Sequence, residues 1–328
     1  MAKKTLYGVI SDFHHHGRLI PAAVEVLISL GAEKIIMNGD LGNQKSGVKE
    51  TQDSFARMFE YMGARGIETI VQPGGHETLD SFEPVIEYYS DKYCNIIDAK
   101  KNQLIESNGH KIVFLPGSDY LCGGDYRIID DVNIPTGRYK EIRNDIKNES
   151  PEGCTEKKDS STNGRAISYF NMNDLRQFVK VPDKTIAVCH IPRKFEDISV
   201  CVDTAIYGRA KEDFYFCEQY IEKGFVFLYS TAKRLMKKGY PVKIQEENRG
   251  NESLGKLFSE LGIKKAINGH FHESGHRAHD SLGNTVDECC PSNELFWNCG
   301  HMDSGQAGIL TVDDGKVSYK NINLYDYL

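Results

Sequence analysis

The sequence predicts an α/β fold with a mostly parallel sheet, because strand-like and helix-like segments alternate through its first third. The apolar, β-rich runs cover residues 5–11, 34–37 and 67–72. The segments with helical periodicity cover residues 19–30, 53–64 and 81–91. Strands that alternate with helices of this length are typical of βαβ units, whose strands run parallel.

Short strand-like segments continue this pattern further along the chain. They cover residues 95–98, 103–107, 111–115, 185–189, 264–267, 295–298, 307–312 and 316–324. The dipeptides Asn108-Gly109 and Asp314-Gly315 each separate two of these segments, and such pairs are strong hairpin turns. A helical segment at 254–261 precedes the strand at 264–267.

Two long stretches interrupt the alternation, at residues 117–183 and 191–251. Within the first, residues 148–163 are rich in Ser, Glu, Lys and Asp and are expected to form a surface loop. The second contains a helix-like run at 225–238. We therefore predict a single domain spanning residues 1–328, with two insertions that could form a cap or contact the substrate.

Composition and net charge are those of an ordinary globular protein and argue against one functional class. Apolar residues make up 40% of the 328 residues and charged residues 27%, which is ordinary for a globular protein. The net charge of -7 argues against a broad footprint for duplex nucleic acid. The basic pairs Lys233-Arg234 and Lys237-Lys238 recur at helical spacing, as on a solvated helix face.

The sequence also predicts a cytoplasmic location. Its N-terminus enters a strand-like run directly, and no segment has the length and apolar character needed to span a bilayer, so no membrane contact is expected. The nine cysteines include no CxxC pair, which favours free thiols in a reducing compartment over a zinc ribbon.

Five short motifs, each directly after a strand-like run, contain the candidate functional residues. They are Asp12-Phe13-His14, Gly39-Asp40, Gly74-Gly75-His76-Glu77, a solitary His190, and Gly269-His270-Phe271-His272. Carboxylate oxygens and imidazole nitrogens are ligands of divalent metal ions. Because groups that follow the carboxyl ends of strands gather at one edge of an α/β sheet, the fold would bring these motifs together. The pattern therefore indicates a dinuclear metal site.

This ordered set of motifs resembles the calcineurin-like metallophosphoesterase superfamily, whose blocks read D-x-H, G-D-x-x-D/N, G-N-H-D/E, a lone H and G-H-x-H. The resemblance implies a two-sheet β-sandwich flanked by helices, with two bound divalent ions. Mn²⁺ is the expected ion, with iron, zinc or nickel as alternatives, because mixed nitrogen and oxygen ligands select weakly. The resemblance assigns Asp12, His14 and His272 to the first ion and His190 and His270 to the second. Asp40 would bridge the two.

The same resemblance implies the activity. Phosphodiester or phosphomonoester bonds would be hydrolysed by in-line attack of a hydroxide that bridges the two ions. Asp40 and His76 would be the catalytic residues, with His76 protonating the leaving oxygen as general acid. The expected substrate is a phosphorylated small molecule or nucleotide. We favour a diester, because no dedicated monoester clamp is evident and the insertions could cradle a larger substrate.

One departure from the family pattern concerns the second ion, because Gly75 stands where the family has a ligating Asn. Either water or a nearby side chain such as His15, His16 or Asn43 replaces the missing ligand, or the second ion is lost. We favour replacement, because the other second-ion ligands and His76 are all present.

Four further residues are candidates for contact with the substrate. Asn43 follows the bridging Asp by three residues, where phosphoprotein phosphatases have an Asp, and Gln44 stands in place of their Arg clamp. A protein phosphatase of that type is therefore disfavoured. His15 adjoins the first motif, Arg193 could bind phosphate oxygens bidentately, and His301 lies in a polar turn expected near the site.

Two other functions remain open from the sequence. The first is a catalytically weakened, metal-binding interaction scaffold, which Gly75 favours and His76 disfavours. The second is a nuclease acting on nucleic-acid ends, with the basic helix at 233–238 lining its groove. The sequence identifies no protein partner.

Overall fold

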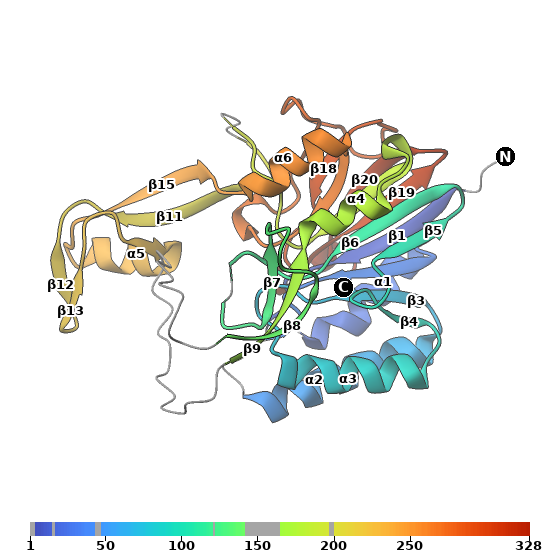
Figure 1. The fold of residues 1–328 in the computed structure, drawn as a ribbon, viewed down its shortest axis with the longest axis horizontal. Helices are drawn as coiled ribbons and strands as arrows, with labels where there is room; N and C mark the ends of the chain where they lie inside the picture. Colours follow the sequence, from blue (N-terminus) through green and yellow to red (C-terminus); the bar gives the residue numbers. More distant parts are fainter. Residues whose placement is uncertain (1–3, 15–16, 43–46, 121, 142–164, 197–199) are drawn as a thin grey trace.

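The computed structural model describes residues 4–14, 17–42, 47–120, 122–141, 165–196 and 200–328. Two six-stranded sheets form its centre (Figure 1). In order, the strands of the first sheet are β20 (Lys316–Asn323), β19 (Gln306–Asp313), β1 (Thr5–Ile10), β2 (Lys34–Asn38), β3 (Glu68–Gln72) and β4 (Ile96–Asp98). Strands β1 to β4 run parallel, while β19 is antiparallel to both β1 and β20.

The second sheet also has a parallel centre. In order, its strands are β17 (Ala278–His279), β18 (Leu295–Asn298), β16 (Lys265–Asn268), β10 (Thr185–Cys189), β6 (His110–Leu115) and β5 (Leu104–Ser107). The four inner strands are parallel, and the two outer ones are antiparallel to their neighbours. The four parallel strands of each sheet therefore deliver their following loops to a common edge of that sheet.

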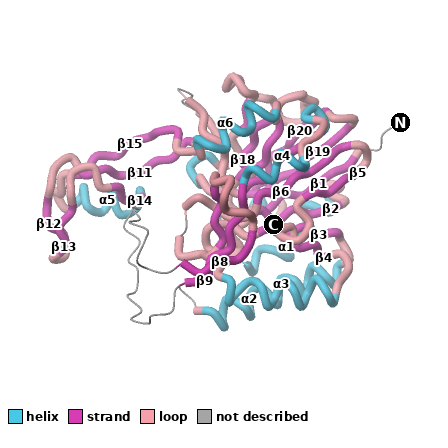
Figure 2. Tube along the Cα trace, viewed as in Figure 1, coloured by secondary structure: helices cyan, strands magenta, loops and turns pink. Residues whose placement is uncertain are grey.

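A shared core joins the two sheets. Val9 and Ile36 of the first sheet belong to the same buried cluster as Val188 and Trp297 of the second, so the sheets pack face to face. The opposite faces pack against helices, which lie outside the sheets (Figure 2). These helices are α1 (Ile20–Ser29), α2 (Val48–Arg65), α3 (Leu79–Lys92), α4 (Leu175–Phe178) and α6 (Glu252–Leu261). The predicted α/β class is confirmed.

The first insertion contains more regular structure than the sequence pattern predicted. Strands β7 (Tyr126–Ile129), β8 (Gly137–Glu141) and β9 (Arg165–Asn171) form a small sheet in which β7 and β9 run parallel. The predicted surface loop at 148–163 lies outside the described residues.

The second insertion forms a projecting element, here called the arm, which spans residues 204–249. It contains β11 (Thr204–Ala210), β12 (Phe214–Phe216), β13 (Gln219–Ile221), β14 (Val226–Leu228), helix α5 (Tyr229–Lys237) and β15 (Val242–Asn248). Figure 1 shows it extending away from the two sheets. A small core of its own includes Phe227, Leu235 and Val242.

The helix predicted over 225–238 is wrong at its N-terminal end. Residues 226–228 form strand β14, which pairs antiparallel with β11, and the helix begins only at Tyr229. The run Phe225-Val226-Phe227 consists of aromatic and β-branched residues, which fit a pleated surface better than an isolated helix end.

The base of the arm lies directly beside two of the predicted metal-binding motifs. Asn251 exchanges backbone hydrogen bonds with Pro192 and Lys194, two and four residues beyond His190. On the other side, the hydroxyl of Ser274, two residues beyond His272, donates to the Thr204 carbonyl at 2.5 Å. Both ends of the arm, at Thr204 and just beyond residue 249, are therefore attached to the segments that carry those histidines.

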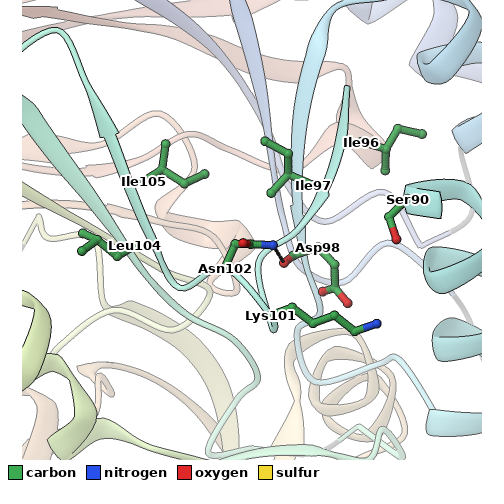
Figure 3. A pocket seen from close by; sticks show the side chains of 8 residues that line it. All are labelled: Ser90, Ile96, Ile97, Asp98, Lys101, Asn102, Leu104 and Ile105. Carbon is green, nitrogen blue, oxygen red and sulfur yellow. Dashed lines mark hydrogen bonds between the residues drawn. The ribbon is translucent and has the colours of Figure 1, made fainter. Parts of the chain in front are cut away.

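A cavity of about 420 Å³ opens between the edge strands β4 and β5 (Figure 3). Its lining includes Ile97, Asp98 and Leu104, and none of the residues of the five motifs. Among the described residues, no helix is both long enough and apolar enough to cross a membrane.

Candidate metal centre

The predicted ligands lie immediately after parallel strands. Asp12 and Asp40 follow the ends of β1 and β2 by two residues, and these strands are hydrogen-bonded neighbours. In the second sheet, His190 follows β10 directly and His270 follows β16 by two residues. Because neighbouring parallel strands end at the same edge, each sheet contributes a pair of donors.

Three of these residues have an unusual backbone conformation. Asp12, Asp40 and His270 have φ angles of 55°, 52° and 68°, in the left-handed region that L-residues rarely adopt. Gly39 is also left-handed, and a Cβ there would come within 2.8 Å of His190 Nδ1 and 2.9 Å of the Gly74 Cα. Strained conformations held this closely by their surroundings cluster at functional sites.

The donor atoms gather into three overlapping sets, and within each set all donors lie within 4.8 Å of one another. One set is Asp12, His14 and His272, and another is Asp40, His190 and His270. These match the ligands predicted for the first and second ions. A third set combines His14, Asp40 and His76, so Asp40 belongs to two sets and could connect two cations.

His190 shows most directly that the site fits a cation. Its Nδ1 lies 2.8 Å from the Asn38 carbonyl oxygen, which can only accept, so Nδ1 carries the proton and donates. Its fully buried Nε2 faces Asp40 Oδ2 at 3.0 Å but makes no well-aligned hydrogen bond. An imidazole with Nδ1 fixed by a carbonyl and an unsatisfied Nε2 beside a carboxylate is a typical metal ligand.

The electrostatics of this cluster are also typical of a cation site. Burial opposes the charged form of His190, but the charges of Asp40 and Asp12 outweigh it and raise its pKa to about 10. Burial alone would raise the pKa of Asp40, yet His190 and His76 hold it well below its usual range. Burial, helped by His190, lowers the pKa of His270 to about 4. A bound cation would replace the protons that the carboxylates attract.

Hydrogen bonds to the carboxylates of Asp40 and Glu77 join the loop after β2 to the loop after β3. Oδ1 of Asp40 accepts hydrogen bonds from the amides of Gly75 at 2.6 Å and His76 at 3.1 Å. The buried Glu77 accepts from the Leu41 amide at 2.6 Å and from the Gly74 amide at 2.6 Å. These bonds leave Oδ2 of Asp40 facing the histidines.

Sequence reasoning missed Asp303, which lies behind His14. Its Oδ2 is 3.0 Å from His14 Nδ1, while His14 Nε2 is 3.5 Å from Asp40 Oδ2. Burial opposes protonation of His14, but the hydrogen bonds to Asp303 and Asp40 raise its pKa to about 11. The amide of Asp303 donates to the Asp12 carbonyl at 3.2 Å, which fixes its position. The sequence signal that could have identified Asp303 is the polar turn after β18, but from that turn we singled out only His301.

Asp303→Ala is expected to weaken binding of the first ion by about 10- to 100-fold, because outer partners of metal-binding histidines contribute on this scale. Isothermal titration with Mn²⁺ measures this directly. Asp313→Ala, an exposed carboxylate at the end of β19, is the matched control. Unchanged affinity for the first ion in Asp303→Ala would exclude this role for Asp303.

Two buried asparagines, also missed by sequence reasoning, brace the ligand histidines of the second ion. Nδ2 of Asn268, the last residue of β16, donates to the carbonyls of Cys189 and Ile191, each at 3.1 Å. Those two residues flank His190. Asn298, the last residue of β18, repeats the arrangement one strand further on. Its Nδ2 donates to the carbonyls of Gly269 and Phe271, each at 3.1 Å, on either side of His270.

Asn268→Ala and Asn298→Ala are each expected to lower the affinity for the second ion more than the affinity for the first. Each change leaves two buried carbonyls without this donor, at a cost of about 1–3 kcal/mol in the free energy of unfolding. Thermal unfolding without metal and Mn²⁺ titration separate the two effects, with the exposed Asn284→Ala as control. Lower stability with unchanged affinity for both ions would show that these amides support the fold alone.

The remaining predicted site residues differ in their placement. His76 Nε2 lies 3.9 Å from Asp40 Oδ2, and His272 Nε2 lies 3.4 Å from Asp12 Oδ1. The ring of His301 stacks on that of His272 with centroids 4.5 Å apart, which places it beside the first set of donors. His15 and Asn43, both predicted to contact substrate, lie outside the described residues.

Arg193 occupies a packing position. Its guanidinium lies 3.9 Å from the centroid of the Phe195 ring and 4.6 Å from that of Phe296. Burial lowers its pKa. The predicted phosphate contact of Arg193 stays a prediction.

Comparisons with known proteins identify the fold and nothing finer. No family model matches the chain, and no curated protein matches it. The chain is similar to the crystal structure of TT1561 of Thermus thermophilus, with a TM-score of 0.52 and 11% sequence identity over 98% of this chain and 100% of that one. A second crystal structure is similar with a TM-score of 0.50 and 12% identity, over 97% of this chain and 99% of that one.

Proposed function

We propose that this chain is a metal-dependent phosphoesterase that hydrolyses phosphodiester or phosphomonoester bonds with two divalent cations. The observation that carries the proposal is the pair of neighbouring three-donor sets, one of which contains Asp12 and the other Asp40. The order of the motifs supports the same conclusion through its resemblance to the calcineurin-like metallophosphoesterases. Two packed sheets flanked by helices agree with the sandwich of that superfamily.

When bound, two divalent cations lower the pKa of water and neutralise phosphoryl oxygens. Two backbone amides donate to Oδ1 of Asp40 and fix the carboxylate, so that its Oδ2 faces His14 and His190. His76 borders this carboxylate and is the proposed donor of a proton to the leaving oxygen. Burial lowers the pKa of His76, and the Asp40 charge opposes that effect. The proposed cation is Mn²⁺, with iron, zinc or nickel as alternatives for such mixed ligands.

The proposal is tested by Mn²⁺-dependent hydrolysis of bis-p-nitrophenyl phosphate and p-nitrophenyl phosphate, with Asp40→Asn protein as control. We expect turnover of at least one substrate that vanishes in the control, with the diester hydrolysed faster. A folded, metal-loaded protein that hydrolyses neither these compounds nor natural nucleotides would instead favour the non-catalytic scaffold.

A nucleic-acid end is a second candidate substrate, favoured by the position of the arm. Helix α5 and its C-cap carry Lys233, Arg234, Lys237 and Lys238 without any acidic side chain, and all four are exposed. The arm that carries them is anchored beside the segments of His190 and His272. For this substrate, we expect Asp40→Asn protein to bind a single-stranded oligonucleotide with an affinity that falls as salt increases. The added substitutions Lys233→Glu and Lys237→Glu should abolish that binding.

A further inference from the structure

The backbone of a distant segment occupies the space beside Gly75. A Cβ added at Gly75 would meet the carbonyl oxygen of Tyr120 at 2.6 Å and the Cβ of Ser118 at 3.3 Å. In an asparagine, the side-chain oxygen lies about 2.4 Å from its own Cβ, as bond lengths dictate. The Tyr120 carbonyl oxygen therefore stands about as far from this Cβ position as the oxygen of an asparagine side chain would.

Residues 117–120 are anchored in this position from several sides. The amide of Gly117 donates to the Pro73 carbonyl at 2.8 Å, and the Gly124 amide donates to the Gly75 carbonyl at 3.0 Å, so bonds on both sides of the segment tie it to the β3 loop. Oδ2 of Asp119 accepts from Asn251 Nδ2 at 2.7 Å, which joins the segment to the base of the arm.

The same segment borders the donors of the second ion. The Gly75 amide donates to Asp40 Oδ1 at 2.6 Å, and the Tyr120 ring lies edge-on to the His270 ring with centroids 6.4 Å apart. Asp40, His190 and His270 together offer three donor atoms. Divalent ions in protein sites take four or more ligands, so this set leaves room for at least one further ligand from the protein or from water.

We propose that the Tyr120 backbone carbonyl is a ligand of the second cation and replaces the side-chain oxygen that Gly75 cannot provide. A peptide carbonyl offers the same kind of amide oxygen as an asparagine side chain. The glycine is then required, because any Cβ at position 75 would displace that oxygen. This inference rests on the dinuclear centre of the proposed function and is independent of its catalysis.

Substitutions at Gly75 test the inference, because the backbone there lies outside the left-handed region and its conformation does not itself exclude a side chain. Gly75→Ala displaces the carbonyl and supplies nothing. Affinity for the second Mn²⁺ should therefore fall by at least the roughly 10- to 100-fold that loss of an outer partner costs, while affinity for the first ion is unchanged. Gly75→Asn displaces the carbonyl but brings its own amide oxygen, so the second ion should be retained within a few-fold. Gly137→Ala, where a Cβ makes an ordinary 3.7 Å contact, is the matched control.

Metal content per chain, Mn²⁺ titration and the electron paramagnetic resonance signal of a coupled ion pair provide readouts that need no turnover. Equal second-ion affinity in native protein and Gly75→Ala would overturn the inference, as would a loss in Gly75→Asn equal to that in Gly75→Ala. Asp119→Ala tests whether the neighbouring carboxylate, rather than the Tyr120 carbonyl, binds the ion. Loss of the second ion in Asp119→Ala but not in Gly75→Ala would also overturn the inference.

Should Gly75→Ala fail to fold, a crystal structure of the native protein with Mn²⁺ decides the question. Tyr120 oxygen within bonding distance of the second ion supports the inference, and a water molecule between them overturns it. A native protein that binds two ions without hydrolysing phosphate esters would contradict the proposed function and leave this inference standing. A native protein that binds no ion would contradict both.

Discussion

Asp40→Asn is expected to reduce phosphoesterase turnover to background and to prevent the binding of a cation pair. Asp40 belongs to the donor set of the second ion and to a set that includes His14, a donor of the first. In the proposed bridging role it would serve both ions, so the change would remove one negative charge from each. Loss of an outer partner of a metal ligand already costs about 10- to 100-fold in affinity, and loss of a shared ligand should cost more. The asparagine keeps an oxygen that can accept from the Gly75 and His76 amides, so the loop itself should remain in place.

Metal analysis after dialysis, together with turnover of both nitrophenyl esters, measures this effect. Asp98→Asn is the matched control, because Asp98 is also buried and ion-paired, with Lys100 at 2.8 Å, but lies at the cavity between β4 and β5. We expect the control to lose stability without losing metal. Two tightly bound ions and normal turnover in Asp40→Asn would remove Asp40 from both roles.

The donors of this centre were predictable from the sequence for a physical reason. Each lies within a few residues of a short apolar run, and parallel strands in neighbouring positions necessarily end together. Asp12 and Asp40 are brought together in this way by the pairing of β1 with β2. The α/β class followed from the same alternation of strands and helices.

The groups that support these donors were not predictable from spacing. Asp303 reaches His14 across 289 positions of the chain, and Asn268 reaches the carbonyls beside His190 across 77 and 79 positions. Such hydrogen bonds depend on tertiary placement and leave no periodic pattern. The sequence led us to expect water or a nearby side chain in place of the missing ligand, and this stays a prediction. The Tyr120 carbonyl, which lies 2.6 Å from a Cβ placed at Gly75, could not have been found from spacing, because it is 45 positions away along the chain.

The role of His76 is the point at which the geometry permits two mechanisms. Its Nε2 is 3.9 Å from Asp40 Oδ2 and its ring centroid is 4.5 Å from that of His14, close enough for His76 to act either as a proton donor or as a ligand. We expect the donor role, so His76→Ala should lower turnover by about 10²- to 10⁴-fold, the usual contribution of a general acid, while both ions remain bound.

Hydrolysis rates for a series of esters whose leaving groups differ in basicity distinguish these two roles more sharply than the rate for a single ester. A general acid matters most when the leaving oxygen is strongly basic, because a weakly basic group departs without a proton. His76→Ala should therefore impair hydrolysis of alkyl esters far more than that of p-nitrophenyl esters, and its rate should depend more steeply on leaving-group pKa. If His76 is instead a metal ligand, His76→Ala should lose bound Mn²⁺, and the hydrolysis rate should fall equally for every ester. The second pattern would assign His76 to the metal shell and leave the proton donor to another residue.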